Sequence, residues 1–281
     1  MLNLKIGILG SGTMGIQLSA LLSYHDVDTV VWNRRVDTKF FKKLSRLIKI
    51  HTRFGDLEKK ISQKEVIYTV DLNDLSDCDI IIETITEDKN SKISLLEKLD
   101  NILINPKVIA TNTSTFSIKD LAKGTKHQEI FVGTHFFNPV LSLKLVEVIK
   151  GNLTSEKTII LITEFLTQLG KTCIHMSDSP GFVVNRLLFL MINEAVKMIE
   201  ADVSDAKSID TCMKLGANHS MGPLELADLI GLDVCLSILN TLYERTQETK
   251  YKPSGILVRY VNDGRHGKKS GKGFYNYKSL T

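Results

Sequence analysis

LKIGILGSGTMG, residues 4–15, places a short apolar run directly before a glycine-rich turn. Residues 16–23 then carry apolar side chains at helical spacing, and residues 29–32 form a second apolar run. Short apolar runs of this kind are typical of buried parallel strands. Strand, glycine turn, helix and strand is the context in which G-x-G-x-x-G predicts a dinucleotide-binding βαβ unit.

Each glycine of this turn has a physical role in such a unit. Gly10 permits the tight turn, Gly12 lets backbone approach a pyrophosphate, and Gly15 lets the helix pack close to the strand. The helix also offers its positive N-terminus to the phosphates. The expected cofactor contacts in this turn are Gly10, Ser11, Gly12, Thr13, Met14 and Gly15.

The end of the second strand bears on which dinucleotide binds. An acid is expected there for the adenosine ribose hydroxyls, but the position holds Asn33, followed by Arg34 and Arg35. A neutral amide removes the charge that would repel a 2′-phosphate, and guanidinium groups can pair with one. The alternative is two exposed arginines beside a tolerated asparagine. We expect all three residues to contact NAD or NADP, and they favour NADP.

Apolar periodicity predicts further strands and helices before residue 180. Strands are expected at 67–70, 79–83, 108–110 and 171–175, and helices at 91–103 and 154–169. Polar residues just past a parallel strand face the ligand crevice of a doubly wound sheet, which singles out Asn112 and Ser114. Ser117 begins a capping box and is expected to be structural. Ser114 lies outside that box, so we expect it to be available to a ligand.

The stretch 130–151, IFVGTHFFNPVLSLKLVEVIKG, predicts a pair of neighbouring strands with chemistry on them. His135 ends the first strand, just before the Asn138-Pro139 turn, and Glu147 lies within the second. A carboxylate that accepts the Nδ1 proton of a histidine fixes its tautomer and raises its basicity. Such a pair suits proton abstraction from an alcohol. The alternative is a core histidine and an unrelated surface glutamate.

A change of pattern after the turn DSPG at 178–181 predicts two domains. Residues 1–180 are expected to form an α/β domain, a Rossmann-type doubly wound and mostly parallel sheet, and residues 181–281 an all-α C-terminal domain. Its helices are expected at 182–200, 206–215, 223–244 and 255–261. The first is apolar on nearly every face, which predicts burial between domains or subunits. We therefore expect a homodimer formed through this domain.

Charge and composition limit the classes of partner. The net charge of +4 is too small to argue for nucleic acid, but it suits an anionic small ligand. The Lys and Arg residues concentrate in a predicted helical hairpin over about residues 36–64 and in a loop at 265–272. No apolar run approaches the ~18 residues of a membrane span. The four cysteines match no metal spacing and predict reduced thiols in a cytoplasmic protein without a metal.

Several motifs together resemble the L-3-hydroxyacyl-CoA dehydrogenase family, most closely its short bacterial 3-hydroxybutyryl-CoA dehydrogenases. The similarity covers nearly the whole chain. Its motifs are GSGTMG at Gly10, NTS at Asn112, THFFNP at Thr134, KLVEVIKG at Lys144, SPGFVVNR at Ser179, KLGANHSMGPLEL at Lys214 and GKKSGKGFY at Gly267. Asn33 departs from the usual acid of the family, which leaves the preference for NAD open.

The resemblance implies a role for each matching residue. His135 would be the general base and Glu147 its orienting partner, while Ser114 and Asn185 would hold the reacting oxygen of the substrate. The implied cofactor contacts are Glu87, Lys92, Asn112, Ser114, Asn138 and Lys269. Solvated loop charges are the alternative for Glu87, Lys92 and Lys269. Ser45 and Lys49 in the basic hairpin are the nearest candidates for contacts to acyl-CoA.

The expected activity is hydride transfer between NAD(P) and an acyl-CoA. The enzyme would interconvert 3-hydroxyacyl-CoA, in particular 3-hydroxybutyryl-CoA, and 3-oxoacyl-CoA such as acetoacetyl-CoA, within fatty acid or butanoate metabolism. One alternative is a related dehydrogenase of a sugar acid such as L-gulonate, against which the basic hairpin argues. The other is a nicotinamide-binding protein without catalysis.

Overall fold

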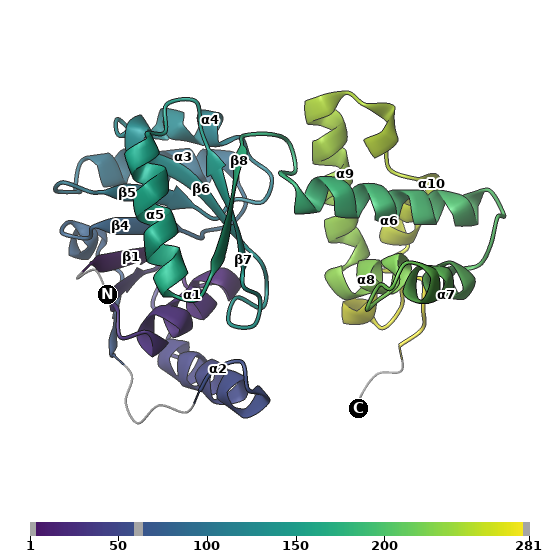
Figure 1. Ribbon diagram of the computed structural model, residues 1–281, viewed down its shortest axis with the longest axis horizontal. Coiled ribbons are helices and arrows are strands. Elements are labelled where there is room, and N and C mark those ends of the chain that lie inside the picture. Colours follow the sequence, from purple (N-terminus) through teal and green to yellow (C-terminus); the bar gives the residue numbers. More distant parts are fainter. Residues whose placement is uncertain (1–3, 59–63, 278–281) are drawn as a thin grey trace. The chain divides into compact units, whose positions relative to one another are not determined.

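The computed structural model describes residues 4–58 and 64–277 of the 281-residue chain. The chain divides into two compact units, Met1–Ser179 and Pro180–Thr281. The first contains all the named strands, and the second contains helices only (Figure 1). The predicted fold class, a mostly parallel α/β sheet followed by an all-α domain, is confirmed.

A single eight-stranded sheet forms the centre of the first unit, in the order β3-β2-β1-β4-β5-β6-β7-β8. All neighbouring strands are parallel except β6 and β7, which are antiparallel. Because parallel strands end at the same edge, the residues after β1, β2, β4, β5 and β6 gather on one side of the sheet, where ligands bind in such folds. The strands are β1 (Lys5–Leu9), β2 (Asp28–Trp32), β3 (Val66–Thr69), β4 (Ile80–Glu83), β5 (Val108–Thr111), β6 (Phe131–Phe136), β7 (Leu145–Lys150) and β8 (Thr172–Ser177).

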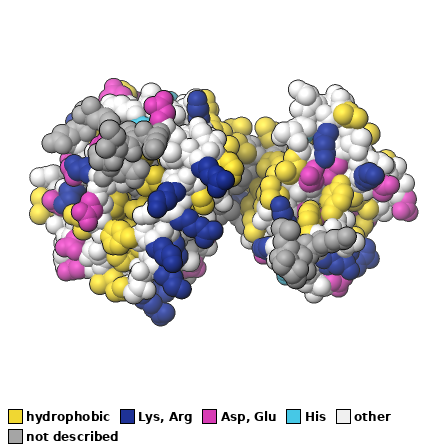
Figure 2. Space-filling model, turned by 90° about the horizontal axis from the view of Figure 1, so that it is seen from below, with side chains coloured by type: hydrophobic (Ala, Val, Ile, Leu, Met, Phe, Trp, Pro, Cys, Tyr) yellow, Lys and Arg dark blue, Asp and Glu magenta, His cyan; other side chains and the backbone are white. Residues whose placement is uncertain are grey.

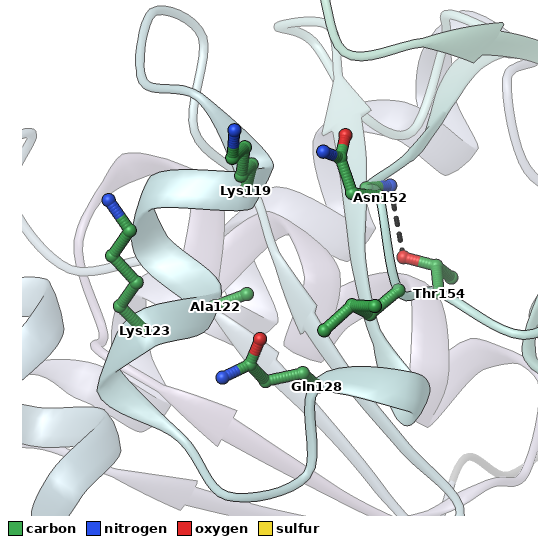
Figure 3. A pocket seen from close by; sticks show the side chains of 8 residues that line it. Lys119, Ala122, Lys123, Gln128, Asn152 and Thr154 are labelled. Atoms are coloured by element: carbon green, nitrogen blue, oxygen red, sulfur yellow. Dashed lines mark hydrogen bonds between the residues drawn. The ribbon is translucent and has the colours of Figure 1, made fainter.

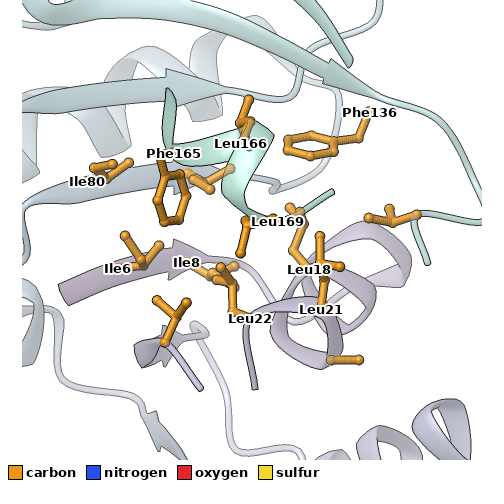
Figure 4. Packing of buried hydrophobic residues seen from close by; sticks show 14 of the residues in the cluster. Ile6, Ile8, Leu18, Leu21, Leu22, Ile80, Phe136, Phe165, Leu166 and Leu169 are labelled. Carbon is orange, nitrogen blue, oxygen red and sulfur yellow. The ribbon is translucent and has the colours of Figure 1, made fainter. Parts of the chain in front are cut away.

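Helices cover both faces of this sheet (Figure 1). The helices α1 (Thr13–Tyr24) and α5 (Glu156–Gln168) lie on one face, and α3 (Lys89–Asp100) and α4 (Ile118–Leu121) on the other. Figure 4 shows Ile6 and Ile8 of β1 packed among apolar side chains of α1 and α5, all of them buried. Each such side chain contributes roughly 1.5–3 kcal/mol through burial. This core fixes α1, and therefore the glycine turn before it, on the sheet.

The basic segment over residues 36–64 was expected to form a helical hairpin. Its described part contains one helix, α2 (Phe40–Phe54), which ends where Gly55 adopts a left-handed φ of 82°. Residues 59–63 lie outside the described residues. Three apolar side chains of α2 (Phe40, Leu44, Ile48) are buried, and its Lys and Arg side chains are largely exposed. Figure 2, which views the molecule from the side where α2 lies, shows Lys and Arg side chains gathered on this unit.

The second unit is built from α6 (Val184–Glu200), α7 (Ala206–Gly216), α8 (Pro223–Ile230), α9 (Leu232–Thr246) and α10 (Gly255–Asn262). The prediction of one helix over 223–244 was wrong. Gly231 has a φ of 108°, which interrupts the helix and bends α9 from α8 by 100°. Within the described residues, no single helix is long and apolar enough to span a membrane, and only this bent pair passes by length and composition.

Part of the apolar surface of α6 stays uncovered. Phe189, Ile192 and Val196 enter the core of the second unit, whereas Leu187 is 66% exposed. Val183, just before the helix, is 47% exposed. An exposed apolar strip beside a complete core is typical of a surface that binds another protein chain.

Candidate active site

The glycine turn between β1 and α1 has the geometry that a dinucleotide requires. Gly10 adopts a φ of 98° and its backbone N–H donates to the carbonyl of Trp32 at 2.8 Å. A Cβ on Gly15 would lie 1.9 Å from the carbonyl oxygen of Gly10, so only glycine allows α1 to approach this closely. A Cβ on Gly12 would meet no atom within 4 Å, and none of the described side chains caps the N-terminus of α1. The approach to the helix N-terminus is therefore open, as phosphate binding needs.

The turn after β2 uses Asn33 for internal contacts. Its Oδ1 accepts from the backbone N–H of Arg34 at 3.0 Å, and its Nδ2 donates to the carbonyl of Arg35 at 3.1 Å. Nδ2 also lies 3.4 Å from the hydroxyl of Tyr68 on the neighbouring strand β3. Both arginine side chains are exposed. The turn thus presents two cations at the edge where β2 ends, and it contains no carboxylate at position 33.

A buried ion pair lies where β4 and β5 end. The Lys92 ammonium donates to both carboxylate oxygens of Glu83, at 2.8 and 2.9 Å, and both side chains are at most 1% exposed. Thr111 donates to the same carboxylate at 2.6 Å. Removing one partner of such a pair leaves the other charge buried and unpaired, which typically lowers the free energy of unfolding by about 3–5 kcal/mol. Lys92, expected as a cofactor contact, thus has a structural role in this network.

Glu87 organises the loop after β5. Its Oε2 lies 3.2 Å from Nζ of Lys92. Its Oε1 accepts from the Thr113 hydroxyl at 2.6 Å and from the backbone N–H of Ser114 at 2.9 Å. Burial alone would raise the pKa of Glu87, but Lys92 and these donors lower it overall. The Ser114 hydroxyl also lies 3.4 Å from this carboxylate, which holds Ser114 at the end of β5. Ser117, as predicted, caps α4.

The antiparallel strands β6 and β7 bring the predicted pair together. His135 and Glu147 are opposite each other in the register, so their side chains leave the sheet on the same face. Nδ1 of His135 lies 2.7 Å from Oε2 of Glu147, and the two residues are 6% and 1% exposed. The ring of Phe137 packs against the imidazole, with centroids 4.5 Å apart. The geometry is that of a histidine whose tautomer is fixed by a carboxylate.

The turn that follows β6 is held by side chains from three other parts of the chain. Gln17 of α1 bonds to Asn138 and Val140. The buried Lys171 ammonium donates to the carbonyl of Val140 and, at 3.0 Å, to the carbonyl of Leu143. Burial lowers the pKa of Lys171 to about 8. A third contact joins the turn to the end of α2: Ser142 donates to Asp56 at 2.9 Å, and Asp56 also pairs with His51. Sequence patterns did not indicate any of these anchors.

Two expected site residues belong to the second unit. Asn185 lies in the first turn of α6 and is 8% exposed. The Lys269 ammonium forms an ion pair with Asp233 at the start of α9, 2.6 Å away. Asn112, in contrast, lies in the first unit beside β6, where its Oδ1 accepts from the backbone N–H of Phe136 at 2.9 Å.

Two of the hollows among the described residues lie within the first unit. One, of about 340 Å³, lies between α1 and α2 and is lined by Thr13, Ile16, Gln17, Lys43, Arg46, Leu47 and Ile50. Lys43 and Arg46 thus line it, whereas Ser45 and Lys49 do not. The other, of about 270 Å³, lies beside α4 (Figure 3). Its lining residue Thr154 bonds to the first residue of β6, so it is at the amino end of that strand, opposite to His135. Neither His135 nor Glu147 is among the residues that line it.

The described residues contain no group of His, Cys, Asp and Glu that could hold a metal ion.

The glycine turn, the crevice at the strand ends and a histidine–carboxylate pair beside it define a dinucleotide-dependent oxidoreductase. Comparison with known families gives the particular kind. Residues 5–179 match the 3-hydroxyacyl-CoA dehydrogenase NAD binding domain, and residues 181–277 match the 3-hydroxyacyl-CoA dehydrogenase C-terminal domain. The chain belongs to the 3-hydroxyacyl-CoA dehydrogenase family, which confirms the resemblance noted above.

Individual relatives agree with this assignment. The chain is 42% identical to a 3-hydroxybutyryl-CoA dehydrogenase of Clostridioides difficile over 98% of this chain and 99% of the relative. It is 38% identical to a probable 3-hydroxybutyryl-CoA dehydrogenase of Deinococcus radiodurans, over 98% and 100%. The crystal structure of (S)-3-hydroxybutyryl-CoA dehydrogenase from Ralstonia eutropha has a TM-score of 0.91 at 35% identity, covering 98% of this chain and 99% of that chain.

Proposed function

We propose that this 3-hydroxyacyl-CoA dehydrogenase interconverts 3-hydroxybutyryl-CoA and acetoacetyl-CoA, with His135 as general acid and base. The observation that carries the proposal is the buried pair of His135 and Glu147, 2.7 Å apart beside the crevice of the NAD-binding domain. The full-length relatives named for 3-hydroxybutyryl-CoA support the choice of acyl group.

His135 would accept the proton of the 3-hydroxyl group. Because Nδ1 faces the Glu147 carboxylate, that nitrogen holds a proton, and Nε2 is the one that exchanges a proton with substrate. The carboxylate stabilises the imidazolium that forms. In the reverse direction, Nε2 returns the proton to the reduced ketone. Ser114 and Asn185 are proposed to donate to the reacting oxygen and so to stabilise the developing alkoxide.

The residues of the first unit fit a nicotinamide dinucleotide. The open N-terminus of α1 and the space above Gly12 would hold the pyrophosphate. A bound nicotinamide would supply the hydride donor and acceptor for the reaction at C3 of the acyl group. Glu87 and Asn112 would act by ordering the loop after β5 and the end of β6, and Asn138 would contact the nicotinamide ribose. Lys92 is proposed to hold the ends of β4 and β5 in place through its ion pair with Glu83. Lys269, which pairs with Asp233 within the second unit, is proposed to contact the cofactor, as in the family.

The cofactor preference is proposed to lean toward NADP. The Asn33 amide orders the turn after β2, so position 33 carries no carboxylate that would repel a 2′-phosphate. The side chains of Arg34 and Arg35 are exposed at this turn and could pair with that phosphate. A charge-assisted hydrogen bond from either guanidinium contributes roughly 1.5–3 kcal/mol.

The phosphates of coenzyme A are proposed to bind on the basic side of α2. Lys49 and Ser45 lie on this helix, and Lys43 and Arg46 line the 340 Å³ hollow between α2 and α1. Since this attraction is between exposed charges, the KM for acyl-CoA should rise with ionic strength. Changing Arg46 to serine should raise that KM more than the same change at Lys214, a cation of the second unit that pairs with Glu225.

One assay separates the candidate functions. An acyl-CoA enzyme would oxidise NADH or NADPH in the presence of acetoacetyl-CoA, whereas a sugar-acid enzyme would reduce NAD in the presence of L-gulonate. Binding of NADH without turnover of either substrate would indicate a binding protein.

His135→Ala should lower kcat by about 10²–10⁴-fold while NADH still binds. A variant that keeps more than half of the wild-type kcat would exclude His135 as the general base.

We also propose that the enzyme acts in the cytoplasm as a homodimer formed through the second unit. Leu187 and Val183 supply the exposed apolar surface for that contact. Sedimentation equilibrium at micromolar concentration should give twice the monomer mass, and Leu187→Glu should shift it toward the monomer. A monomer mass for the unaltered protein would contradict the proposal.

A further inference from the structure

Gln17 occupies an unusual place between the cofactor helix and the turn after the catalytic strand. It lies in α1, four residues beyond Thr13, and is only 5% exposed. Its Nε2 donates to Oδ1 of Asn138 at 2.8 Å and lies 3.2 Å from the carbonyl of Thr13. Its Oε1 accepts from the backbone N–H of Val140 at 2.7 Å. Both ends of one buried amide thus contact the same turn.

These contacts determine which way two amide groups face. A backbone N–H can only donate, so the atom of Gln17 next to Val140 must be the oxygen. The atom next to Asn138 is then the Gln17 nitrogen, which can only donate, so the Asn138 atom that meets it must be an oxygen. The remaining polar group of the Asn138 side chain is its Nδ2, a donor. The backbone of Val140 therefore fixes Asn138 through Gln17.

We propose that Gln17 is a positioning residue that holds the Asn138 amide with its Nδ2 donor, rather than its oxygen, presented to the bound cofactor. The inference rests on the proposed role of Asn138 at the nicotinamide ribose. Asn138 is exposed while Gln17 is buried, so the fixed amide has one side in the protein and one side toward the crevice. A ribose hydroxyl would accept from this donor and keep its own proton for another acceptor, which it would lose if the Asn138 oxygen took the place of Nδ2.

Gln17→Glu tests this orientation with almost no change of shape. The ionised carboxylate of this variant still accepts from Val140, but it cannot donate to Asn138. Asn138 then turns to donate its own Nδ2 to the carboxylate and presents its oxygen to the cofactor. Asn138→Asp gives the same result by another route, because Gln17 still donates to one oxygen and the other faces the cofactor. Each variant should raise the NADH dissociation constant about tenfold, the equivalent of one hydrogen bond.

Changes at the two positions should not add. The double variant that combines Gln17→Leu with Asn138→Asp should bind NADH about as weakly as Asn138→Asp alone, because the aspartate already lacks the donor that Gln17 would orient. Acidification should rescue Gln17→Glu, since a protonated carboxyl donates through its hydroxyl and accepts through its carbonyl as glutamine does. A role in stability alone would give neither the coupling nor the rescue. Ser142→Ala, which removes another anchor of the same turn without touching Asn138, is the matched control and should bind NADH normally.

The measurements are fluorescence titration with NADH at two pH values and thermal unfolding of each variant. If Asn138→Asp leaves the dissociation constant unchanged, Asn138 has no role at the cofactor and the proposal falls with it. If Asn138→Asp weakens binding but Gln17→Glu does not, Asn138 keeps its role and positioning by Gln17 is refuted. Should Gln17→Glu fail to fold, Gln17→Leu, which removes both hydrogen bonds without adding a charge, should still weaken NADH binding severalfold. Unchanged binding in Gln17→Leu would also refute it.

Discussion

Replacing Glu147 by glutamine removes one negative charge from the candidate site while keeping the shape of the side chain. The Glu147 carboxylate is 1% exposed and lies 2.7 Å from Nδ1 of His135. A glutamine oxygen can still accept the Nδ1 proton, so the tautomer and the packing should survive. What is lost is the attraction between a carboxylate and the imidazolium that forms during turnover.

The size of the loss follows from this geometry. Hydrogen bonds to charged groups contribute roughly 1.5–3 kcal/mol. Two charges about 4 Å apart at an effective dielectric constant near 20 interact by about 4 kcal/mol, which sets an upper bound. Since about 1.4 kcal/mol corresponds to a tenfold rate change, kcat should fall about 10- to 100-fold. The loss should appear in kcat and in kcat/KM, because the interaction strengthens only as His135 takes the proton.

The assay is the loss of NADH absorbance with acetoacetyl-CoA, together with NADH titration and thermal unfolding. Glu147→Gln should bind NADH with an affinity close to that of the unaltered enzyme. Glu164→Gln, an exposed glutamate on α5, serves as the control and should be fully active. A kcat within threefold of the unaltered enzyme would refute the reasoning, since the carboxylate would then contribute less than about 0.7 kcal/mol to the reaction.

Three further predictions concern the cofactor and the fold. The enzyme should use NADPH at least as well as NADH, and Arg34→Ala or Arg35→Ala should reduce kcat/KM for NADPH selectively. A tenfold preference for NADH in the unaltered enzyme would exclude the proposed preference for NADPH. Gly12→Ala should unfold at the wild-type temperature but bind NADH weakly, whereas Gly15→Ala should lower the unfolding temperature, because its Cβ would lie 1.9 Å from a carbonyl oxygen. The pKa of Lys171 is lowered from 10.5 to about 8 by burial, so the unfolded chain holds the extra proton between these values and stability should rise with pH across that window. Denaturant unfolding should show this rise, and Lys171→Met should abolish it.

Local patterns predicted the parts of this enzyme that short segments determine. The glycine turn carries its own signal in the spacing of Gly10, Gly12 and Gly15, and in the structure Gly10 has the positive φ of a tight turn and Gly15 the close packing of helix on strand. Two apolar runs joined by an Asn-Pro turn predicted neighbouring strands that could bring His135 and Glu147 together, and the structure shows these strands paired antiparallel with the two residues opposite each other. Both cases depend on residues close together in the chain.

The parts that the sequence did not reveal depend on contacts between distant residues. Gln17 bonds to Asn138 across 121 positions, whereas the segment around Gln17 shows only apolar residues at helical spacing. The engagement of Ser114 by Glu87 joins two loops 27 positions apart. The break at Gly231 was missed because apolar periodicity runs through it, although a glycine within a helical pattern was the signal that could have revealed it.

The antiparallel pairing of β6 with β7 also bears on how the chain can misfold. Along β7 the buried Val146 and Val148 alternate with Glu147, so a slip of one residue would move every side chain to the opposite face. Glu147 would then be buried without His135, and an unpaired buried carboxylate costs several kcal/mol. A misregistered molecule would therefore be unstable as well as inactive. Preparations should contain active molecules and unfolded ones, with no reservoir of well-folded, inactive protein that differs only in strand register.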